Sequence, residues 1–149
     1  MEFQKFLIGD NHMSDVHDKT TRSKNMSAIR GKGNKSTELK FLKLLKNNKI
    51  TGWIRHYKYA PGTPDFVFRK QRISVFIDGC YWHKCPDCFI TPKSNTEFWM
   101  NKINSNVDRD IRNDILSLKK KWKVFRVREC KLKNGSEHII DKLNENLNE

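Results

Sequence analysis

Cysteine is scarce in this sequence of 149 residues: three of its four cysteines lie between Cys80 and Cys88, and the last is Cys130. Long apolar runs are missing as well. None approaches the roughly 18 residues of a membrane span, and Asp10 interrupts the apolar start of the chain, which disfavours a signal peptide. These shortages exclude a membrane-spanning protein and disfavour a disulfide-rich secreted one. We therefore expect a cytoplasmic protein.

Acidic residues are also few, with 17 Asp and Glu against 30 Lys and Arg, a net charge of +13. The basic excess is spread over residues 19–49 and 119–133. Such an excess favours a polyanionic partner, most simply a nucleic acid. A basic surface that binds nothing is the alternative, because charge alone does not identify a ligand.

The cysteines that are present have the spacing of a zinc site. Cys85 and Cys88 form a CxxC knuckle, in which two thiolates can turn onto one tetrahedral Zn²⁺. Cys80 lies just upstream, and Cys130 adds a second, distant segment. Four cysteines close the coordination shell, so this zinc would be structural. Two disulfides, or unrelated buried thiols, are the alternative interpretation.

Helices are predicted near both ends and in the middle of the chain. Ser36 can cap a helix that runs to about Asn48, with Glu38 in its first turn, where the helix dipole favours a carboxylate. Thr96 can cap a long helix that has one apolar stripe and a charged, solvated opposite face. Its stripe is Ile103, Val107, Ile111, Ile115 and Leu118, and its charged face is Arg109, Asp110, Arg112 and Asp114.

Strands are predicted at residues 53–59, 65–69, 73–77 and 123–128, and a closing helix follows around residues 139–143. A hairpin turn centred near residue 71 would place Asp65 opposite Ile77 or Asp78. The resulting order, α, β, β, β, α, β, α, predicts an α/β fold in which helices flank a mixed sheet. We expect one domain, with no internal repeat.

A carboxylate at the end of one strand, close to a second oxygen donor, suits Mg²⁺, which could polarise a scissile phosphate. Pro64-Asp65 opening a strand after a helix with Glu38 matches part of the PD-(D/E)xK nuclease core, but the usual glutamate-x-lysine is absent. His83 then becomes the candidate general base. A core or zinc-associated histidine is the alternative.

Several motifs in one order resemble the very-short-patch-repair (Vsr) DNA mismatch endonucleases, over roughly residues 14–133. The resemblance implies a restriction-endonuclease-like fold with structural zinc. It implies a Mg²⁺-dependent nick 5′ to the thymine of a T·G mismatch in double-stranded DNA, by a monomer of the bacterial nucleoid. A mismatch-repair matchmaker is a candidate partner. The matching stretches are residues 15–26, Pro61-Gly-Thr-Pro-Asp-Phe66, Asp78-Gly-Cys-Tyr-Trp-His83, Thr96-Glu-Phe-Trp99 and Arg128-Glu-Cys130.

The resemblance also assigns residue roles. Asp65 corresponds to the metal-binding aspartate, His83 to the catalytic histidine and Glu38 to a supporting carboxylate. Ile77 would offer Mg²⁺ its backbone carbonyl. The zinc ligands are Cys80, Cys85, Cys88 and Cys130. The expected DNA contacts are the inserted aromatics Tyr81, Trp82 and Trp99, the arm residue Met26, and the phosphate-binding Arg22 and Lys24.

Asp78 departs from the family pattern, because it stands where a known member has a second active-site histidine. It would either share in proton transfer or bind the metal. By length and composition, we expect residues 1–13 to be a disordered extension, residues 14–35 a basic DNA-contacting arm and residues 36–149 the nuclease domain. A restriction-type endonuclease acting on matched DNA, or a DNA-binding module without catalysis, are the alternative functions.

Overall fold

The computed structural model describes residues 18, 20–21, 24 and 37–149. The chain divides into two compact units, Met1–Arg30 and Gly31–Glu149. In the first unit, the Thr21 backbone N–H donates a 2.6 Å hydrogen bond to Asp18 Oδ1, and Lys24 is helical and exposed. The predictions for Met26, Arg22, the cap Ser36 and the extension 1–13 lie outside the described residues.

The second unit is a mixed α/β structure, as the sequence predicts. Its sheet has four strands in the order β1-β2-β3-β4, with β3 and β4 parallel and the other two pairs antiparallel. None of the helices in the described part of the chain is long and apolar enough to cross a membrane. The elements are α2 (Glu38–Asn47), β1 (Trp53–Arg55), β2 (Phe66–Phe68), β3 (Ile73–Asp78), α3 (Thr96–Lys119), β4 (Lys123–Arg128), α4 (Glu129–Asn134) and α5 (Ser136–Asn148).

The β2–β3 hairpin is present, but its register differs by one residue from the prediction. Phe66 pairs with Val75, and continuing this register places Asp65 across from Phe76. The turn is therefore centred between residues 70 and 71. The Asp65 side chain nevertheless reaches the next residue, because its Oδ2 accepts a 2.7 Å hydrogen bond from the Ile77 backbone N–H. The predicted proximity of Asp65 to the end of β3 is confirmed.

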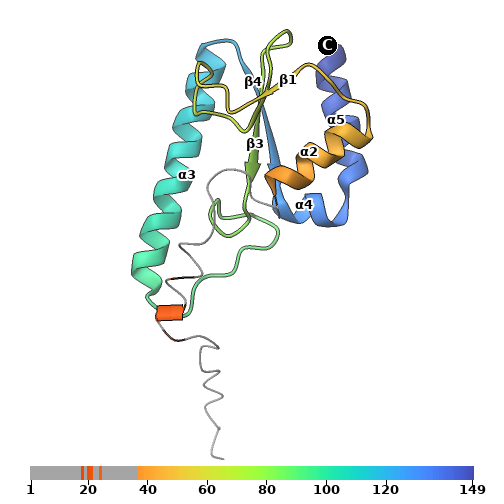
Figure 1. The fold of residues 1–149 in the computed structure, drawn as a ribbon. Coiled ribbons are helices and arrows are strands. Elements are labelled where there is room, and N and C mark those ends of the chain that lie inside the picture. The colour runs from red at the N-terminus through yellow and green to blue at the C-terminus, as the bar shows by residue number, and fades with distance from the viewer. Residues whose placement is uncertain (1–17, 19, 22–23, 25–36) are drawn as a thin grey trace, which may run out of the picture. The chain divides into compact units, whose positions relative to one another are not determined.

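One face of the sheet carries the apolar core. Alternate residues of a strand point to the same face, so Ile73 and Val75 of β3 pack there with Val127 of β4. Helices α2, α4 and α5 cover this face, while α3 lies on the other side of the sheet (Figure 1). The core cluster is Phe41, Leu45, Phe66, Phe68, Ile73, Val75, Val127, Leu132, Ile139 and Leu143.

Helix α3 is present, but the prediction of its inward face is wrong. Of the expected apolar stripe, Ile103 is buried, whereas Ile111, Ile115 and Leu118 are exposed. Asp110 and Asp114, expected in solvent, instead bond to residues under the helix. The physical reason is a charged side chain on the facing strand, Arg126, which binds carboxylates and draws the polar face of the helix inward.

Three smaller predictions are also corrected. Strand β1 ends at Arg55, because His56 adopts a positive φ of 50°. The residue before α3 is Asn95, and the Thr96 hydroxyl hydrogen-bonds the Pro92 carbonyl rather than capping the helix. The short helix α4, which carries Cys130, was not anticipated.

Candidate active site

The first functional group lies where α2, β1 and β2 meet. Glu38, Asp65 and His56 each bring one potential ligand atom to within 4.8 Å of the other two. Glu38 is buried in the first turn of α2. Its Oε1 accepts hydrogen bonds from the Arg55 guanidinium and lies 2.8 Å from His56 Nε2. Arg55 and His56 therefore hold Glu38 in place, a role that sequence reasoning did not assign to them.

The surroundings of Asp65 disfavour its ionised form. Burial raises its pKa above the usual value; the Ile77 N–H opposes this, and the nearby Glu38 charge adds to it. Burial and the Glu38 charge both disfavour the ionised carboxylate of Asp65 unless a cation binds beside it. Since the N–H and C=O of a strand residue point the same way, the Ile77 carbonyl faces the Asp65 side of β3. Two acids and a carbonyl form a set of hard oxygen donors that fits Mg²⁺.

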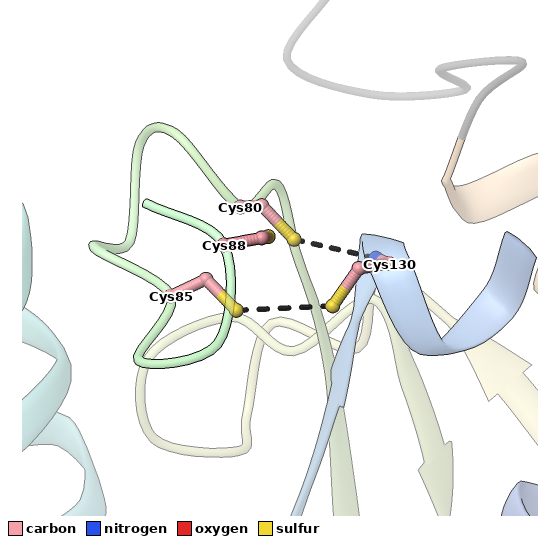
Figure 2. Close-up of side chains that lie close together, drawn as sticks. All are labelled: Cys80, Cys85, Cys88 and Cys130. Atoms are coloured by element: carbon pink, nitrogen blue, oxygen red, sulfur yellow. Dashed lines mark hydrogen bonds between the residues drawn. The ribbon is translucent and has the colours of Figure 1, made fainter. Parts of the chain in front are cut away.

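The four cysteines form a second group, as predicted. Their sulfurs all lie within 4.8 Å of one another, and Figure 2 shows three of them reaching from the loop after β3 toward Cys130 at the start of α4. The Sγ atoms of Cys85 and Cys130 are 3.8 Å apart. Two thiolates of one tetrahedral zinc, each at about 2.3 Å, are separated by about 3.8 Å.

The surroundings of these cysteines favour metal ligation over disulfides. All four cysteines lie in the described residues, and each is a free thiol. Burial raises the pKa of Cys80, whereas at Cys85 the backbone N–H groups of Asp87 and Cys88 and the Cys88 thiol outweigh burial, so the pKa of Cys85 is lowered. The backbone N–H of Cys130 also donates to Cys80 Sγ, at 3.3 Å. The residues present therefore fit a tetrahedral thiolate site.

The third group surrounds His83, in the loop between β3 and α3. His83 Nδ1 lies 2.5 Å from Asp110 Oδ2. Because an ionised carboxylate only accepts hydrogen bonds, Nδ1 carries the proton and donates it. The bond from His83, with the His83 and Arg126 charges, outweighs the effect of burial and lowers the pKa of Asp110. With Nδ1 bonded to Asp110, Nε2 is the ring nitrogen left to act as a base.

Asp78 is engaged by arginines rather than by His83. Both of its carboxylate oxygens accept from Arg126 Nη1, at 2.9 and 3.0 Å, and Arg128 Nη1 lies 3.3 Å from Oδ2. His83 Nδ1 is 3.7 Å from Asp78 Oδ1. Asp78 is almost fully buried, so this pairing compensates its charge.

The predicted aromatic residues lie together beside His83. Trp82 contacts both Tyr81 and Trp99 edge to face, with ring centroids 5.2 and 6.0 Å away. The Lys102 ammonium lies 5.6 Å from the Trp82 ring centroid and 5.7 Å from that of Trp99. The Asn106 side chain donates to the Trp82 carbonyl and ties the loop to α3. Large rings beside a cation form a surface on which nucleobases can stack.

Comparisons with known proteins identify the family. A family model described as DNA mismatch endonuclease Vsr matches residues 14–89. DNA mismatch endonuclease Vsr of Escherichia coli (strain K12) is 41% identical over 141 residues, which cover 92% of this chain and 87% of that protein. The chain belongs to the Vsr family. Two further relatives are nicking enzymes: V.NmeAIP of Neisseria meningitidis, 40% identical over 82% of this chain and 86% of its own length, and V.NaeI of Lentzea aerocolonigenes, 33% identical over 82% and 76%.

Membership in the Vsr family confirms the resemblance inferred from the motifs. In this Vsr-family chain, the predicted site residues of the second unit gather around the end of β3. Ile77 bonds Asp65, and the next residue, Asp78, lies close to His83. The charge of Asp78 also acts on Asp65. The three groups therefore share one strand end.

Sequence reasoning missed Asp110 and Arg126 as members of the site, and it missed Asp114 as a partner of Arg126. A signal was available, because Arg126 stands between Phe125 and Val127 in a strand of the predicted sheet. An arginine on a sheet face that a helix covers is expected to pair with acids. The charged face of α3 contains those acids.

Proposed function

We propose that this protein is a DNA endonuclease with a restriction-endonuclease-like fold that nicks one strand 5′ to the thymine of a T·G mismatch. The observation that carries the proposal is the shared strand end, where Asp65, beside the buried Glu38, bonds Ile77, and the next residue, Asp78, lies close to a histidine oriented by Asp110. Two acids beside an imidazole base suit phosphodiester hydrolysis. The Vsr-family relationship supplies the substrate class.

Two metal ions belong to the proposal. Asp65 and the Ile77 carbonyl would hold Mg²⁺, with Glu38 supporting them, and Mg²⁺ bound there stabilises charge on the phosphate and leaving oxygen. Zn²⁺ held by the four cysteines would fix the loop that carries His83. It would act together with hydrogen bonds within the loop, such as His83 N–H to the Gly79 carbonyl and Cys85 N–H to the Cys80 carbonyl.

The side chains of this site divide the chemistry. His83 accepts a proton from the attacking water at Nε2, while Asp110 keeps the opposite nitrogen protonated and the ring in one orientation. Glu38 holds a second negative charge beside Asp65, and both attract a cation. Asp78, which the sequence predicts to share in proton transfer or bind the metal, has its carboxylate held by Arg126 and Arg128.

DNA recognition would rest on aromatic and basic residues. Tyr81, Trp82 and Trp99 would insert beside the mismatch, where unstacking a base step costs about a few kcal/mol. Arg22 and Lys24 would contact phosphates, and Met26 would reach the groove. We expect the 14–35 arm to bind DNA, the protein to act as a monomer on the bacterial nucleoid, and a mismatch-repair matchmaker to assist it.

The test is a nicking assay on a labelled duplex with one T·G mismatch, with and without Mg²⁺. Wild type, His83→Ala and His138→Ala are compared; His138 is an exposed histidine of α5 and serves as the matched control. The proposal predicts a Mg²⁺-dependent nick 5′ to the mispaired thymine. His83→Ala should lower its rate by at least about 10²-fold, and His138→Ala should not. Equal loss in both variants would refute a specific role for His83.

A second candidate is a nick at a fixed sequence of fully paired DNA. The observation that favours it is that V.NmeAIP and V.NaeI, both similar over most of this chain, are type II nicking enzymes. The same residues would perform the hydrolysis. The two candidates differ in substrate, so a matched duplex of identical sequence distinguishes them.

A further inference from the structure

Arg126 occupies the centre of a partly buried ion network between β4 and α3. Its Nη1 binds both oxygens of Asp78, while Nε and Nη2 bind the two oxygens of Asp114 at 3.1 and 2.8 Å. The guanidinium also lies 4.7 Å from the centroid of the Phe76 ring. All three nitrogens of the planar guanidinium therefore have acceptors. Burial alone would lower the pKa of Arg126, but the surrounding carboxylates outweigh it and raise this pKa.

His83 has two carboxylates within reach but bonds only one. Asp110 Oδ2 lies 2.5 Å from Nδ1, and Asp78 Oδ1 lies 3.7 Å from the same nitrogen. A single N–H can donate one good hydrogen bond, so the two acids compete for it. Asp78 does not win this competition, because Arg126 Nη1 holds both of its oxygens and Oδ1 stays 3.7 Å from Nδ1.

We propose that Arg126 is a positioning residue for the nicking reaction: it holds Asp78 away from His83, so that Asp110 alone orients the imidazole. This inference rests on the proposed function. It assigns Asp78 no ligand role toward metal, because its oxygens are turned to Arg126 and Arg128.

The geometry shows why Arg128 cannot replace Arg126. Arg128 Nη1 is 3.3 Å from Asp78 Oδ2 and also 3.3 Å from the His83 carbonyl, so its contact with Asp78 is shared and one-sided. Without Arg126, the Oδ1 oxygen nearest His83 loses its strong donor. A buried carboxylate that keeps only this shared contact is poorly compensated. The Asp78 side chain would therefore turn to the His83 N–H and pull the ring from Asp110.

Three variants separate positioning from a general loss of structure. Arg126→Gln releases Asp78. Asp114→Asn is the matched control, because it weakens the same network while leaving Arg126 bound to Asp78. The double variant Asp78→Asn/Arg126→Gln removes the competing charge. Circular dichroism melts verify folding, and Arg126→Lys takes the place of Arg126→Gln if the latter does not fold, since one ammonium cannot reproduce the fork.

The first readout is the single-turnover nicking rate on the T·G duplex at saturating protein, together with the Kd for DNA. Arg126→Gln should lower the rate by about 10- to 100-fold, as expected for a misplaced base, with Kd unchanged. Asp114→Asn should stay within about twofold of wild type. The double variant should nick about tenfold faster than Arg126→Gln, because the competing carboxylate is gone.

The second readout does not need activity. Imidazole NMR signals of His83, assigned against His83→Ala, are recorded at one pH above the ordinary histidine pKa of about 6.5. Wild type and Asp114→Asn should give one sharp set. Arg126→Gln should give a broadened or doubled set, because the ring moves between Asp110 and Asp78.

The outcomes are distinguishable. If wild type nicks but Arg126→Gln nicks equally well with one sharp His83 set, the positioning role is wrong. If Asp78→Asn fails to raise the rate of Arg126→Gln, competition by Asp78 is wrong. If wild type does not nick any duplex, the proposed function fails, while the NMR result still decides whether Arg126 fixes the His83 ring.

Discussion

The two faces of the central sheet are built from opposite chemistry. The face under α2, α4 and α5 is apolar, with Phe41, Phe66 and Leu143 fully buried. The face under α3 carries Asp78 and Arg126 on the strands and Asp110 on the helix. Burying apolar surface stabilises a fold by about 25 cal/mol per Å². An ion network removed from water adds little net stability, because desolvation offsets the attraction between its charges. The first face therefore stabilises the fold, and the second fixes the positions of reactive groups.

This difference predicts that variants of the two faces will separate stability from activity. Substitutions on the apolar face should lower the free energy of unfolding and leave the nicking rate of the folded protein intact. Substitutions on the ionic face should mainly lower the nicking rate and change the free energy of unfolding less.

The largest expected effect is on activity, at Asp65. Asp65→Asn should lower the nicking rate by at least about 10³-fold, because several kcal/mol of cation-assisted stabilisation is lost. Stability should rise: the raised pKa of Asp65 means that the folded protein disfavours the ionised acid at neutral pH, and Asn is uncharged. Thermal melts with and without Mg²⁺ test this, since Mg²⁺ should raise the Tm of wild type only. A lower Tm for the metal-free variant would contradict it.

Next comes the apolar face. Phe41→Ala should lower the free energy of unfolding by about 3–5 kcal/mol, because it leaves a cavity at a fully buried site. Urea denaturation measures the change. At a temperature where the variant remains folded, its single-turnover nicking rate should match wild type, and a large drop in rate would show that the faces are not independent.

Asp110→Asn sharpens the comparison on the ionic face. The nicking rate should fall by about 10²-fold, since the neutral amide can also donate and no longer fixes the His83 proton on Nδ1. Asp110 has a lowered pKa, so it contributes stability that is present above the ordinary value of 3.8 and lost as pH falls through its folded value. The stability difference between wild type and Asp110→Asn should therefore shrink below pH 3.8. A difference that grows there would contradict the assignment.

A smaller effect is expected at Gly62, in the connection that leads to Asp65. Gly62 has a φ of 75°, and an added Cβ would lie 2.9 Å from Asn113 Cγ on α3. Gly62→Ala should cost about 1–3 kcal/mol from crowding and backbone strain. Gly52→Ala is the matched control, because its φ is 84° but nothing lies within 4 Å. Equal destabilisation in urea would show that the Asn113 contact is unimportant.

The smallest effect is expected at Ser74, on the α3 side of β3. Its hydroxyl is fully buried and has no hydrogen-bond partner in the described part of the chain. Ser74→Ala removes an unsatisfied polar group, so the free energy of unfolding should stay constant or rise by about 1 kcal/mol. Urea denaturation measures the change. A fall of about 1 kcal/mol in the free energy of unfolding would contradict the prediction and indicate that the Ser74 hydroxyl has a hydrogen-bond partner.

The sequence predicted those features that depend on local pattern. The cysteine spacing located the thiolate cluster, and the β2–β3 hairpin brought Asp65 to Ile77 within one residue of the expected register. The inward face of α3 could not be predicted from the periodicity of the helix alone. Apolar residues recur at helical spacing on the face that is exposed in the structure. Which face turns inward depends on the partner strand, and Arg126 favours acids over isoleucines. Pairing between segments far apart in sequence decides such features.

The most direct test of the account compares two duplexes that differ in one base. Wild-type protein with Mg²⁺ is mixed in excess with a T·G duplex and with its T·A counterpart, and both single-turnover rates and the cut position are measured. The account predicts a nick 5′ to the mispaired thymine and a preference for the mismatch of at least about 10²-fold, since opening a paired step costs a few kcal/mol more. Equal rates on the two duplexes would contradict mismatch recognition and establish a nicking enzyme for matched DNA.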